Sequence, residues 1–292
     1  MIVIDYSQTA ISNLMAELGG RTDVEINVPL IRHMILNSIR GYKKKFGNTY
    51  GEMVLACDSK NYWRKEIFPF YKKHRKKDRE DSGFDWKAIF DTLDTIRDEI
   101  QSFFPYKVLW IEGAEADDII AVMAKYSQTS SNGNPLFDEP EPFLVISGDH
   151  DFVQLQKYKN VKQFSPTQKK FVVPDSTPER ALLEHTIRGD KGDGVPNVLS
   201  PDESVYENIR QRPITSKKID EWTDPAKRPQ DLEFQTRWIR NQTLVDFNFI
   251  PADVEQRILQ TYLSLPNKDR SKLFNYFVHH KMKNMMEVIE EF

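Results

Sequence analysis

Two aspartates separated by one residue, Asp149 and Asp151, follow closely on an apolar run at 143–146. Residues two apart in an extended chain point to the same side, so we expect these two carboxylates to lie side by side. Neighbouring carboxylates repel each other, and both stay ionised only if a cation lies between them. An apolar run bounded by a turn signal is typical of a buried strand. The pair therefore predicts a cation site at the end of a strand.

The same arrangement, an apolar run that ends in acids, occurs at three other places. Asp5 follows the run 2–4, Asp58 follows the run 53–57, and the run 108–111 leads into a third acidic group. The acids that follow the four runs are Asp5, Asp58, Glu115, Asp117, Asp118, Asp149 and Asp151.

Helical patterns lie between these runs. Apolar spacing predicts helices over 30–39, 85–104 and 119–126, a surface loop over 127–142, and further short strands over 161–173. Strands that alternate with helices indicate an α/β fold with a mainly parallel sheet. Ligands bind such sheets outside the carboxyl ends of the strands, so we expect the acids to meet at one edge.

The pattern changes after about residue 180. Helices are predicted over 181–188, 252–263 and 272–278, and no clear strand follows. We therefore expect residues 1–180 to form an α/β domain and residues 181–292 to form a second, helical region.

Oxygen ligands without a cysteine or histidine cluster favour a hard cation, Mg²⁺ or Mn²⁺. The acids are too many for one ion. Two ions about 4 Å apart can stabilise both the attacking and the leaving oxygen of a phosphodiester displacement. One acid alone, such as Asp5, is equally well explained as a helix N-cap, and only the four groups together indicate a metal site.

The segment from Lys60 to Arg79 is basic, with aromatic residues between the charges. Basic groups bind phosphates and aromatic faces stack on bases, a mixture that suits single-stranded or frayed nucleic acid. A charged run can also be an ordinary solvated surface. The interleaved rings and the position directly after Asp58 favour nucleic-acid binding.

Two later stretches carry weaker signals. Residues 189–197 are rich in glycine and contain Asp190, Lys191 and Asp193. A tight turn of this kind can present backbone N–H groups to a phosphate, although an ordinary turn between helices would look the same. The stretch 214–218 offers hydroxyl groups and the charges of Lys217 and Lys218 for a second backbone contact.

Composition limits the class of protein. The chain has 292 residues, a net charge of -3 and a single cysteine, Cys57, which we expect to be a core residue in a reducing compartment. It shows no basic leader and no apolar run near the roughly 20 residues of a membrane helix. We expect a soluble, intracellular protein of the cytoplasm, or of the host cytoplasm if the chain is encoded by a phage.

Taken together in this order, the motifs resemble the flap endonuclease/5′-nuclease family, most closely its T4-type phage ribonuclease H members, over nearly the whole chain. The residues that carry the resemblance are Val3–Asp5, Cys57–Asp58, Tyr71–Arg75, Glu115–Asp118, Ser147–Phe152 and Gly189–Asp193.

This resemblance implies a PIN-like α/β nuclease domain over 1–180, with a helical arch at about 60–95 above the site. It also implies a helical DNA-binding region over 181–292 with a helix–three-turn–helix element that grips duplex DNA. The stretch 197–211 contains no glycine and so departs from the family's glycine-rich second hairpin.

The resemblance also implies roles for single residues. Lys72 looks like the arch lysine that contacts the scissile phosphate, Arg75 like its partner, and Tyr71 like a base-stacking aromatic. The first metal site would comprise Asp5, Asp58, Glu115, Asp117 and Asp118, and the second Asp149, Asp151 and Asp193 with Asp190 in support. Further nucleic-acid contacts would come from Lys73, Lys76, Lys77, Arg79, Lys191, Lys217 and Lys218.

The implied activity is that of a Mg²⁺-dependent 5′-nuclease with two ions, for which Mn²⁺ can substitute. It would act as a 5′-to-3′ exonuclease and flap endonuclease, and as a ribonuclease H that removes RNA primers in replication. Its substrates would be DNA with 5′ ends or flaps and RNA–DNA hybrids. The expected partners are a sliding clamp and a single-strand DNA-binding protein, and the expected state is a monomer.

Two other readings stay open from the residues alone. A haloacid-dehalogenase-like phosphatase also places an Asp at its first strand end and has a late Gly-Asp motif after a strand. That class needs a second Asp at position 7, where this chain has Ser7, and here Gly189 follows helical sequence. A non-catalytic DNA-binding scaffold would bind DNA without metal-dependent cleavage.

Overall fold

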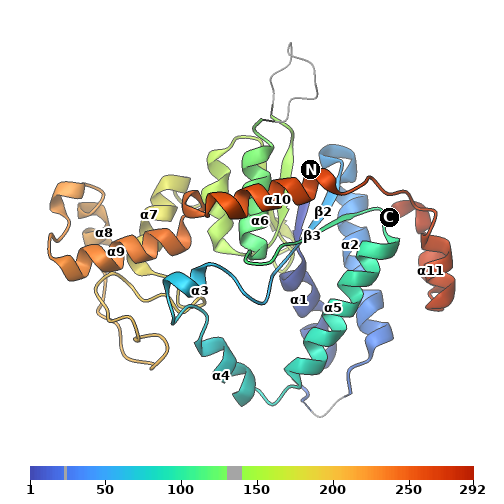
Figure 1. Cartoon of the computed structure of the whole chain (residues 1–292), viewed down its shortest axis with the longest axis horizontal. Coiled ribbons are helices and arrows are strands. Elements are labelled where there is room, and N and C mark those ends of the chain that lie inside the picture. Colours follow the sequence, from blue (N-terminus) through green and yellow to red (C-terminus); the bar gives the residue numbers. More distant parts are fainter. Residues whose placement is uncertain (23–24, 130–139) are drawn as a thin grey trace.

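A six-stranded sheet forms the centre of the fold (Figure 1). The structure is a computed structural model, and it describes residues 1–22, 25–129 and 140–292. The order of the sheet is β3-β2-β1-β4-β5-β6, and all neighbours are parallel except β6, which runs antiparallel to β5. The strands are β1 (Ile2–Asp5), β2 (Met53–Cys57), β3 (Lys107–Trp110), β4 (Phe143–Ile146), β5 (Val161–Ser165) and β6 (Lys170–Phe171). The predicted α/β class and mainly parallel sheet are confirmed. Most of the predicted loop at 127–142 lies outside the described residues.

Both faces of the sheet are covered, which explains why the strands read as continuous apolar runs. In β1, Ile2 and Ile4 face one core cluster while Val3 faces the other. The first cluster contains side chains of α1 (Tyr6–Leu18), α2 (Val28–Tyr50) and α5 (Trp86–Phe103). The second contains side chains of α6 (Ala116–Tyr126) and α10 (Ala252–Ser264). Cys57 is a buried residue of the first cluster, as predicted.

The strand order reverses at β1, which pairs with β2 on one side and with β4 on the other. A reversal of this kind leaves a crevice at the carboxyl ends of the strands. Asp5 ends β1, and Asp149 follows β4. The topology therefore places these two acids at the crevice.

The chain between β2 and β3 forms an arch-like excursion. It passes through α3 (Arg64–Ile67) and α4 (His74–Asp81) and returns to the sheet through α5 (Figure 1). Asp85 caps α5 by accepting a hydrogen bond from the N–H of Ala88 at 3.0 Å. The helix predicted over 85–104 is confirmed, and the predicted arch at 60–95 corresponds to this excursion.

No strand follows β6 in the described part of the chain, so the helical character predicted after residue 180 is confirmed. Helices α1, α8 and α9 had no counterpart among the predicted elements. None of the described helices combines the length and apolarity needed to cross a membrane. The remaining helices are α7 (Pro178–Arg188), α8 (Ser216–Glu221), α9 (Leu232–Val245), α11 (Leu273–His279), α12 (Lys283–Met286) and the 3₁₀ turns η1 (His150–Lys157), η2 (Pro225–Lys227), η3 (Phe247–Phe249) and η4 (Ile289–Glu291).

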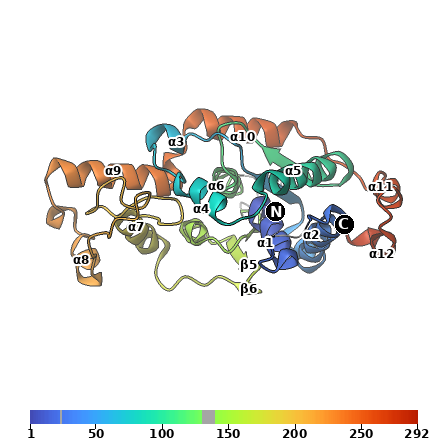
Figure 2. The same ribbon diagram turned by 90° about the horizontal axis from the view of Figure 1, so that it is seen from below.

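The helices after residue 180 pack in two different places. Helices α7, α8 and α9 share a small core of their own that includes Trp222 and Trp238. Phe247 and the buried face of α10 join one face of the sheet, whereas α11 and Phe292 join the other. Figure 2 shows α7, α8 and α9 at one end of the molecule and α11 and α12 at the opposite end. A domain boundary at residue 180 stays a prediction, because the end of the chain packs on the sheet.

Glu99 on α5 joins three helices, and this contact yields a stability prediction. Its carboxylate accepts hydrogen bonds from Arg32 at 2.7 and 2.8 Å and from the Tyr276 hydroxyl at 2.6 Å. We expect Glu99→Gln to lower the free energy of unfolding at neutral pH by about 1–3 kcal/mol, as measured by urea denaturation. The exposed neighbour Asp98, changed to Asn, is the control, and an equal effect of both changes would contradict the role of Glu99.

The stabilisation by Glu99 should also depend on pH. Burial alone would raise the pKa of Glu99, but hydrogen bonds from Arg32 and Tyr276 outweigh it and hold the pKa below its ordinary 4.5. A carboxyl group with a lowered pKa stabilises the fold above its unfolded pKa, and the contribution is lost as the pH falls through the folded pKa. The difference between the native chain and Glu99→Gln should therefore shrink when the denaturation is repeated in acid.

Candidate active site

A cavity of about 940 Å³ lies at the carboxyl ends of the strands. Acids that are far apart in sequence line it, as their positions after separate strands predicted. The acids that follow strands are Asp5, Asp58, Glu115, Asp117 and Asp149, and Asp193 joins them from the glycine-rich turn after helix 178–188.

The opposite part of the cavity lining comes from the arch. Lys72 and Arg75 lie before and at the start of α4, and the rings of Trp86 and Phe90 come from α5. The basic and aromatic segment therefore faces the acids across one cavity. The other basic and aromatic residues that line the cavity are Tyr6, Lys60, Tyr62, Lys65, Arg79, Lys87 and Arg97.

Three of the acids are held in the same way. An oxygen of Asp5 accepts from the Gln8 N–H at 2.9 Å, and one of Asp58 accepts from the Ala116 N–H at 2.9 Å. An oxygen of Asp149 accepts from the Asp151 N–H at 3.0 Å. Each carboxylate is thus fixed by one oxygen, while its second oxygen receives no backbone N–H from the described residues. The N-cap explanation of Asp5 and its ligand role are compatible.

The acids in the cavity lack sufficient counter-charge. Burial, with the nearby charges of Asp58 and Asp149, raises the pKa of Asp5 to about 7. Burial also raises the pKa of Asp117 well above its ordinary value, against the lowering effect of Lys72. Desolvated carboxylates in mutual repulsion are the donor set that a hard divalent cation stabilises. The residues present therefore fit Mg²⁺ or Mn²⁺.

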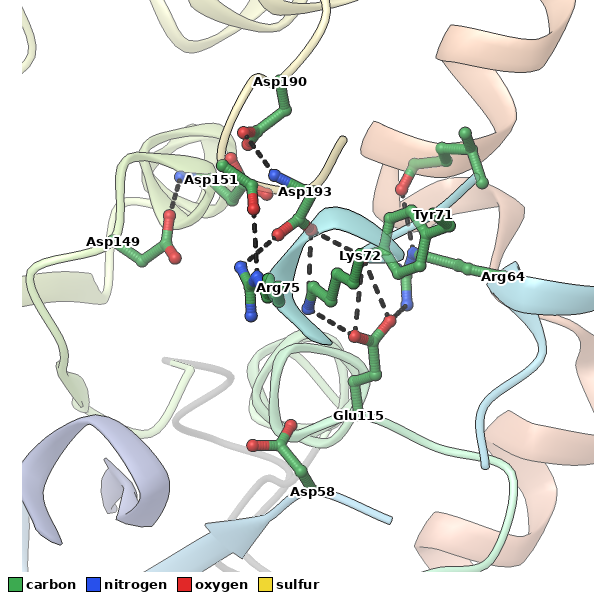
Figure 3. Close-up of polar contacts among 12 residues, drawn as sticks. Asp58, Arg64, Tyr71, Lys72, Arg75, Glu115, Asp149, Asp151, Asp190 and Asp193 are labelled. Atoms are coloured by element: carbon green, nitrogen blue, oxygen red, sulfur yellow. Dashed lines mark hydrogen bonds and ion pairs between the residues drawn. The ribbon is translucent and has the colours of Figure 1, made fainter. Parts of the chain in front are cut away.

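Basic side chains of the arch contact two other acids (Figure 3). The Lys72 ammonium lies 2.5 Å from a Glu115 oxygen and 3.5 Å from an Asp193 oxygen. Arg75 lies 2.6 Å from Asp193, and the Tyr71 hydroxyl donates to Asp193 at 2.6 Å. Burial alone would lower the pKa of Lys72, but the carboxylates of Asp193 and Glu115 raise it well above its ordinary value. Lys72 is therefore an ammonium ion that neutralises candidate metal ligands.

Asp118 does not share this arrangement, and its predicted place among the metal ligands needs correction. It is fully buried, accepts from the Trp63 indole N–H at 3.2 Å and from the Glu115 N–H at 2.9 Å, and lies 2.8 Å from Arg64. Asp118 stabilises the start of α6 and the base of the arch. All its contacts are within the protein core, so it is a structural residue.

Arg64 is a buried residue beside the cavity whose position the sequence did not reveal. Its guanidinium is buried, lies 2.7 Å from Glu115, and donates to the carbonyl of Leu244 on α9 at 2.8 Å. It belongs to the basic segment from Lys60 to Arg79 that is predicted to bind nucleic acid, and spacing alone gives no sign of its burial. Arg64 fixes Glu115 and connects the arch to the C-terminal helices.

Tyr71 also differs from its predicted role as a base-stacking residue. It is only 4% exposed, and its ring packs edge-on against Tyr62 with the centroids 5.8 Å apart. No face of the ring is free for a base. Trp86 and Phe90 are better placed to stack on a base, since both are half-buried and line the cavity. Their ring centroids lie 5.6 Å apart.

A second group lies beside the cavity. His185 of α7 is close to both Asp151 and Asp190, with Nδ1 3.1 Å from an Asp151 oxygen and Nε2 3.3 Å from an Asp190 oxygen. The ligand atoms of the three residues all lie within 4.8 Å of one another. The sequence had placed Asp151 with Asp149 and Asp193, but Asp149 lines the cavity and Asp193 is bound to the arch. His185 was missed because only the fold shows that α7 turns it toward Asp151.

The charges in this second group are strongly coupled. Burial raises the pKa of Asp151 to about 8, because the nearby acids Asp149 and Asp190 add to it and His185 offsets only a part. Burial alone would raise the pKa of Asp190, but the hydrogen bond and charge of His185 lower it to about 2. Burial would lower the pKa of His185, and the charges of Asp151 and Asp190 raise it to about 9. An imidazolium therefore sits where two carboxylates need a cation.

The glycine-rich turn joins this group to the arch. Gly189 has a φ of +67°, and a Cβ there would lie 2.4 Å from the Val195 carbonyl oxygen. A Cβ on Gly194, whose φ is +79°, would lie 2.9 Å from the Phe70 carbonyl oxygen. Gly189 is therefore needed for the close packing of the turn on itself, and Gly194 for its close contact with the arch. The phosphate contact of this turn remains a prediction. Among the predicted nucleic-acid contacts, those exposed to solvent are Lys73, Lys76, Lys77, Lys191, Lys217 and Lys218.

Comparison with known proteins agrees with this architecture. Residues 12–181 match the family model described as the N-terminal resolvase-like domain of 5′-3′ exonucleases, and residues 176–292 match that of the C-terminal domain of T4 RNase H. The chain is 33% identical to ribonuclease H of Enterobacteria phage T4, over 99% of this chain and 95% of that protein.

Solved structures show the same fold. The T5 D15 protein co-crystallised with metal ions has a TM-score of 0.61 and 17% identity over 90% of this chain and 97% of that one. The T5 5′-exonuclease with bound divalent metal ions (zinc) has a TM-score of 0.61 and 18% identity over 90% of this chain and 98% of that one.

Proposed function

Because this chain belongs to the 5′-3′ exonuclease family that includes T4 ribonuclease H, we propose that it is a Mg²⁺-dependent 5′-nuclease of DNA replication. It removes RNA primers by 5′-to-3′ exonuclease, flap endonuclease and ribonuclease H activity. Its substrates are DNA with 5′ ends or flaps and RNA–DNA hybrids. The observation that carries this proposal is the cavity in which acids from separate strand ends face Lys72 and Arg75.

The proposed metal ligands follow from the contacts. Asp5, Asp58, Asp117 and Asp149 would hold one cation in the cavity, and Asp151 and Asp190 would hold a second. Glu115 and Asp193 can join them once the arch side chains have moved away. When bound, two such ions activate a water and neutralise charge that develops on the scissile phosphate.

Lys72 and Arg75 supply positive charge to the same phosphate. Both are paired with carboxylates, so they are ionised and held within the cavity. A phosphate that enters the cavity offers oxygens that replace Glu115 and Asp193 as their partners. Hydrogen bonds between charged groups are the strongest of their kind, and they favour the state with the most charge on the phosphate.

The aromatic wall of the cavity suits unpaired bases. Trp86 and Phe90 share this wall with Asp91 and Asp94, which are paired with Lys87 and Arg97. Lys60 and Lys65 lie on the chain segment that follows β2. We propose that bases at the 5′ end stack on the two rings while their phosphates face the lysines and the cations.

We expect Trp86→Ala to weaken binding of a 5′ flap by about 5- to 100-fold, the range for loss of one stacked base. A fluorescent base analogue near the 5′ end, quenched when it stacks, measures both affinity and stacking. Trp110→Ala is the matched control, because Trp110 is 42% exposed and lies outside the cavity lining. Equal quenching in both variants would contradict the stacking role.

A sliding clamp and a single-strand DNA-binding protein are the proposed partners in replication. The haloacid-dehalogenase-like phosphatase is not retained, since family membership contradicts it and the Gly189–Asp190 motif follows helix α7 instead of a strand. Membership of a nuclease family likewise argues against a non-catalytic scaffold.

The proposed function is tested with three 5′-labelled substrates: a flap, a nicked duplex and an RNA–DNA hybrid. We expect short products from the 5′ end with Mg²⁺ and none with a chelator. Cleavage that survives the chelator, or hydrolysis of a small phosphate ester without cleavage of the flap, would overturn the proposal.

A further inference from the structure

His185 gives one of the two acidic groups a chemical character that the other lacks. The cavity acids offer only oxygen, whereas Asp151 and Asp190 are joined by an imidazole with both nitrogens near a carboxylate. Among the residues that the structure describes, this is the only set of three or more His, Cys, Asp or Glu ligands whose atoms all lie within 4.8 Å.

The fold holds these three side chains together. His185 is on the last turn of α7, whose carbonyl at His185 accepts from the Gly189 N–H at 2.8 Å. Helix α7 packs against η1, which carries Asp151, and the turn after α7 carries Asp190. His185 is 20% exposed, Asp151 13% and Asp190 25%, so the group is sheltered but reachable. The ligand atoms are therefore preorganised on rigid elements.

The distances between the ligand atoms of these three residues are close to those between the ligands of a bound ion. Ligands about 2.0–2.1 Å from an octahedral ion are roughly 3–4 Å apart. The three ligand atoms lie within 4.8 Å of one another, so they have to approach by about 1 Å to reach this spacing. Whichever ring nitrogen binds the ion, the other remains near a carboxylate that can accept its N–H and fix the ring.

Resting on the proposed metal-dependent function, we propose that His185 is a nitrogen ligand of the cation held by Asp151 and Asp190, and that it gives this position a preference for Mn²⁺ over Mg²⁺. When the ion binds, it replaces one ring proton of the imidazolium, and this proton is released to the solvent. Mg²⁺ favours all-oxygen sites and gives up water reluctantly. Imidazole favours transition metals, and affinity at a mixed nitrogen and oxygen site rises from Mn²⁺ onward along the first row. The two positions of one active site thus differ in the ion that they prefer.

The test compares the native chain with His185→Asn and with the control His150→Asn. His150 is an exposed histidine between Asp149 and Asp151 in sequence, so its replacement changes the same residue type next to the same acids. Mn²⁺ binding is followed by electron paramagnetic resonance at fixed pH, with Mg²⁺ as competitor. We expect His185→Asn to weaken Mn²⁺ binding by about 10- to 100-fold and Mg²⁺ binding far less. His150→Asn should leave both unchanged.

Pulsed electron paramagnetic resonance supplies a direct second readout. Mn²⁺ bound to the native chain and to His150→Asn should show coupling to a directly bound ¹⁴N nucleus, and His185→Asn should lose it. No such coupling in the native chain would overturn the proposal, even if the variant does not fold. Equal weakening of Mn²⁺ and Mg²⁺ binding would also overturn it, because an ion pair that only orients the carboxylates predicts that result.

The failure of this inference can be told apart from failure of the proposed function. If the chain cleaves no nucleic acid with either cation but shows the nitrogen coupling, the nuclease proposal fails and ligation by His185 stands. If Mg²⁺ supports cleavage and no nitrogen binds Mn²⁺, the nuclease proposal stands and His185 is only an ion-pair partner.

Discussion

Asp149→Asn is expected to lower the rate of 5′-flap cleavage at saturating Mg²⁺ by at least about 100-fold while the Kd for DNA changes by less than about threefold. Asp149 lines the cavity at the strand reversal, and its carboxylate is fixed by the Asp151 N–H at 3.0 Å. Asparagine keeps that acceptor oxygen and the side-chain volume but removes the charge that holds a cation. DNA contacts depend on the basic arch, so binding should survive. Single-turnover cleavage and a binding assay in Ca²⁺ separate the two effects.

Asp91→Asn is the matched control for this prediction. Asp91 lines the same cavity but belongs to α5 and is paired with Lys87 at 2.6 Å on an exposed surface. The same change of side chain should there leave the cleavage rate nearly intact. Full Mg²⁺-dependent turnover of Asp149→Asn, or an equal loss in both variants, would remove Asp149 from the metal site.

The meeting of the cavity acids could be predicted because it depends on strand polarity. Asp5, Asp58 and Asp149 each come after an apolar run, and parallel strands bring their carboxyl ends to one edge. That argument needs only the order of strands and helices along the chain. It does not depend on which strands are neighbours, and so the convergence of these acids could be predicted without the strand order.

The different orientations of adjacent residues on a helix could not be predicted in this way. Asp117 and Asp118 have the same side chain, yet Asp117 lines the cavity and Asp118 points into the core toward Trp63 and Arg64. Successive helical residues point in different directions. The sequence does not fix the first residue of α6 closely enough to predict which of the two aspartates faces the cavity.

The residues that were misjudged depend on contacts over long sequence distances. The buried Tyr71 donates its hydroxyl hydrogen bond to Asp193, and the buried Arg64 donates to the carbonyl of Leu244. A basic and aromatic segment read by itself looks like a surface. Its burial was decided by partners up to 180 residues away, which no local pattern reveals.

Asp193 is at the centre of the contacts between the arch and the acids. Asp193 connects the glycine-rich turn to Tyr71 and Arg75, and the backbone N–H of Lys72 donates to the Asp193 carbonyl at 2.7 Å. Lys72 itself has a positive φ of 53°, a conformation that costs energy for a residue with a side chain. The turn therefore holds Lys72 in place. We propose that the Lys72 ammonium competes with a metal cation for the carboxylate of Glu115.

Lys72→Met should therefore have two opposite effects. We expect the single-turnover rate of flap cleavage to fall by about 100-fold or more, because a positive charge on the scissile phosphate is lost. We expect the affinity for Mn²⁺ to rise by roughly tenfold, because Glu115 and Asp193 lose a competing ammonium at 2.5 and 3.5 Å. Rapid-quench kinetics and a Mn²⁺ titration without DNA measure the two effects separately.

Lys73→Met is the matched control, since Lys73 is exposed and its ammonium lies over the rings of Phe70 and Tyr206, away from the acids. It should weaken DNA binding slightly and leave both the chemical step and Mn²⁺ affinity unchanged. A Lys72→Met variant with slower cleavage but unchanged Mn²⁺ affinity would show that Glu115 and Asp193 are not metal ligands. A variant with weaker DNA binding and a normal chemical step would instead make Lys72 a binding residue.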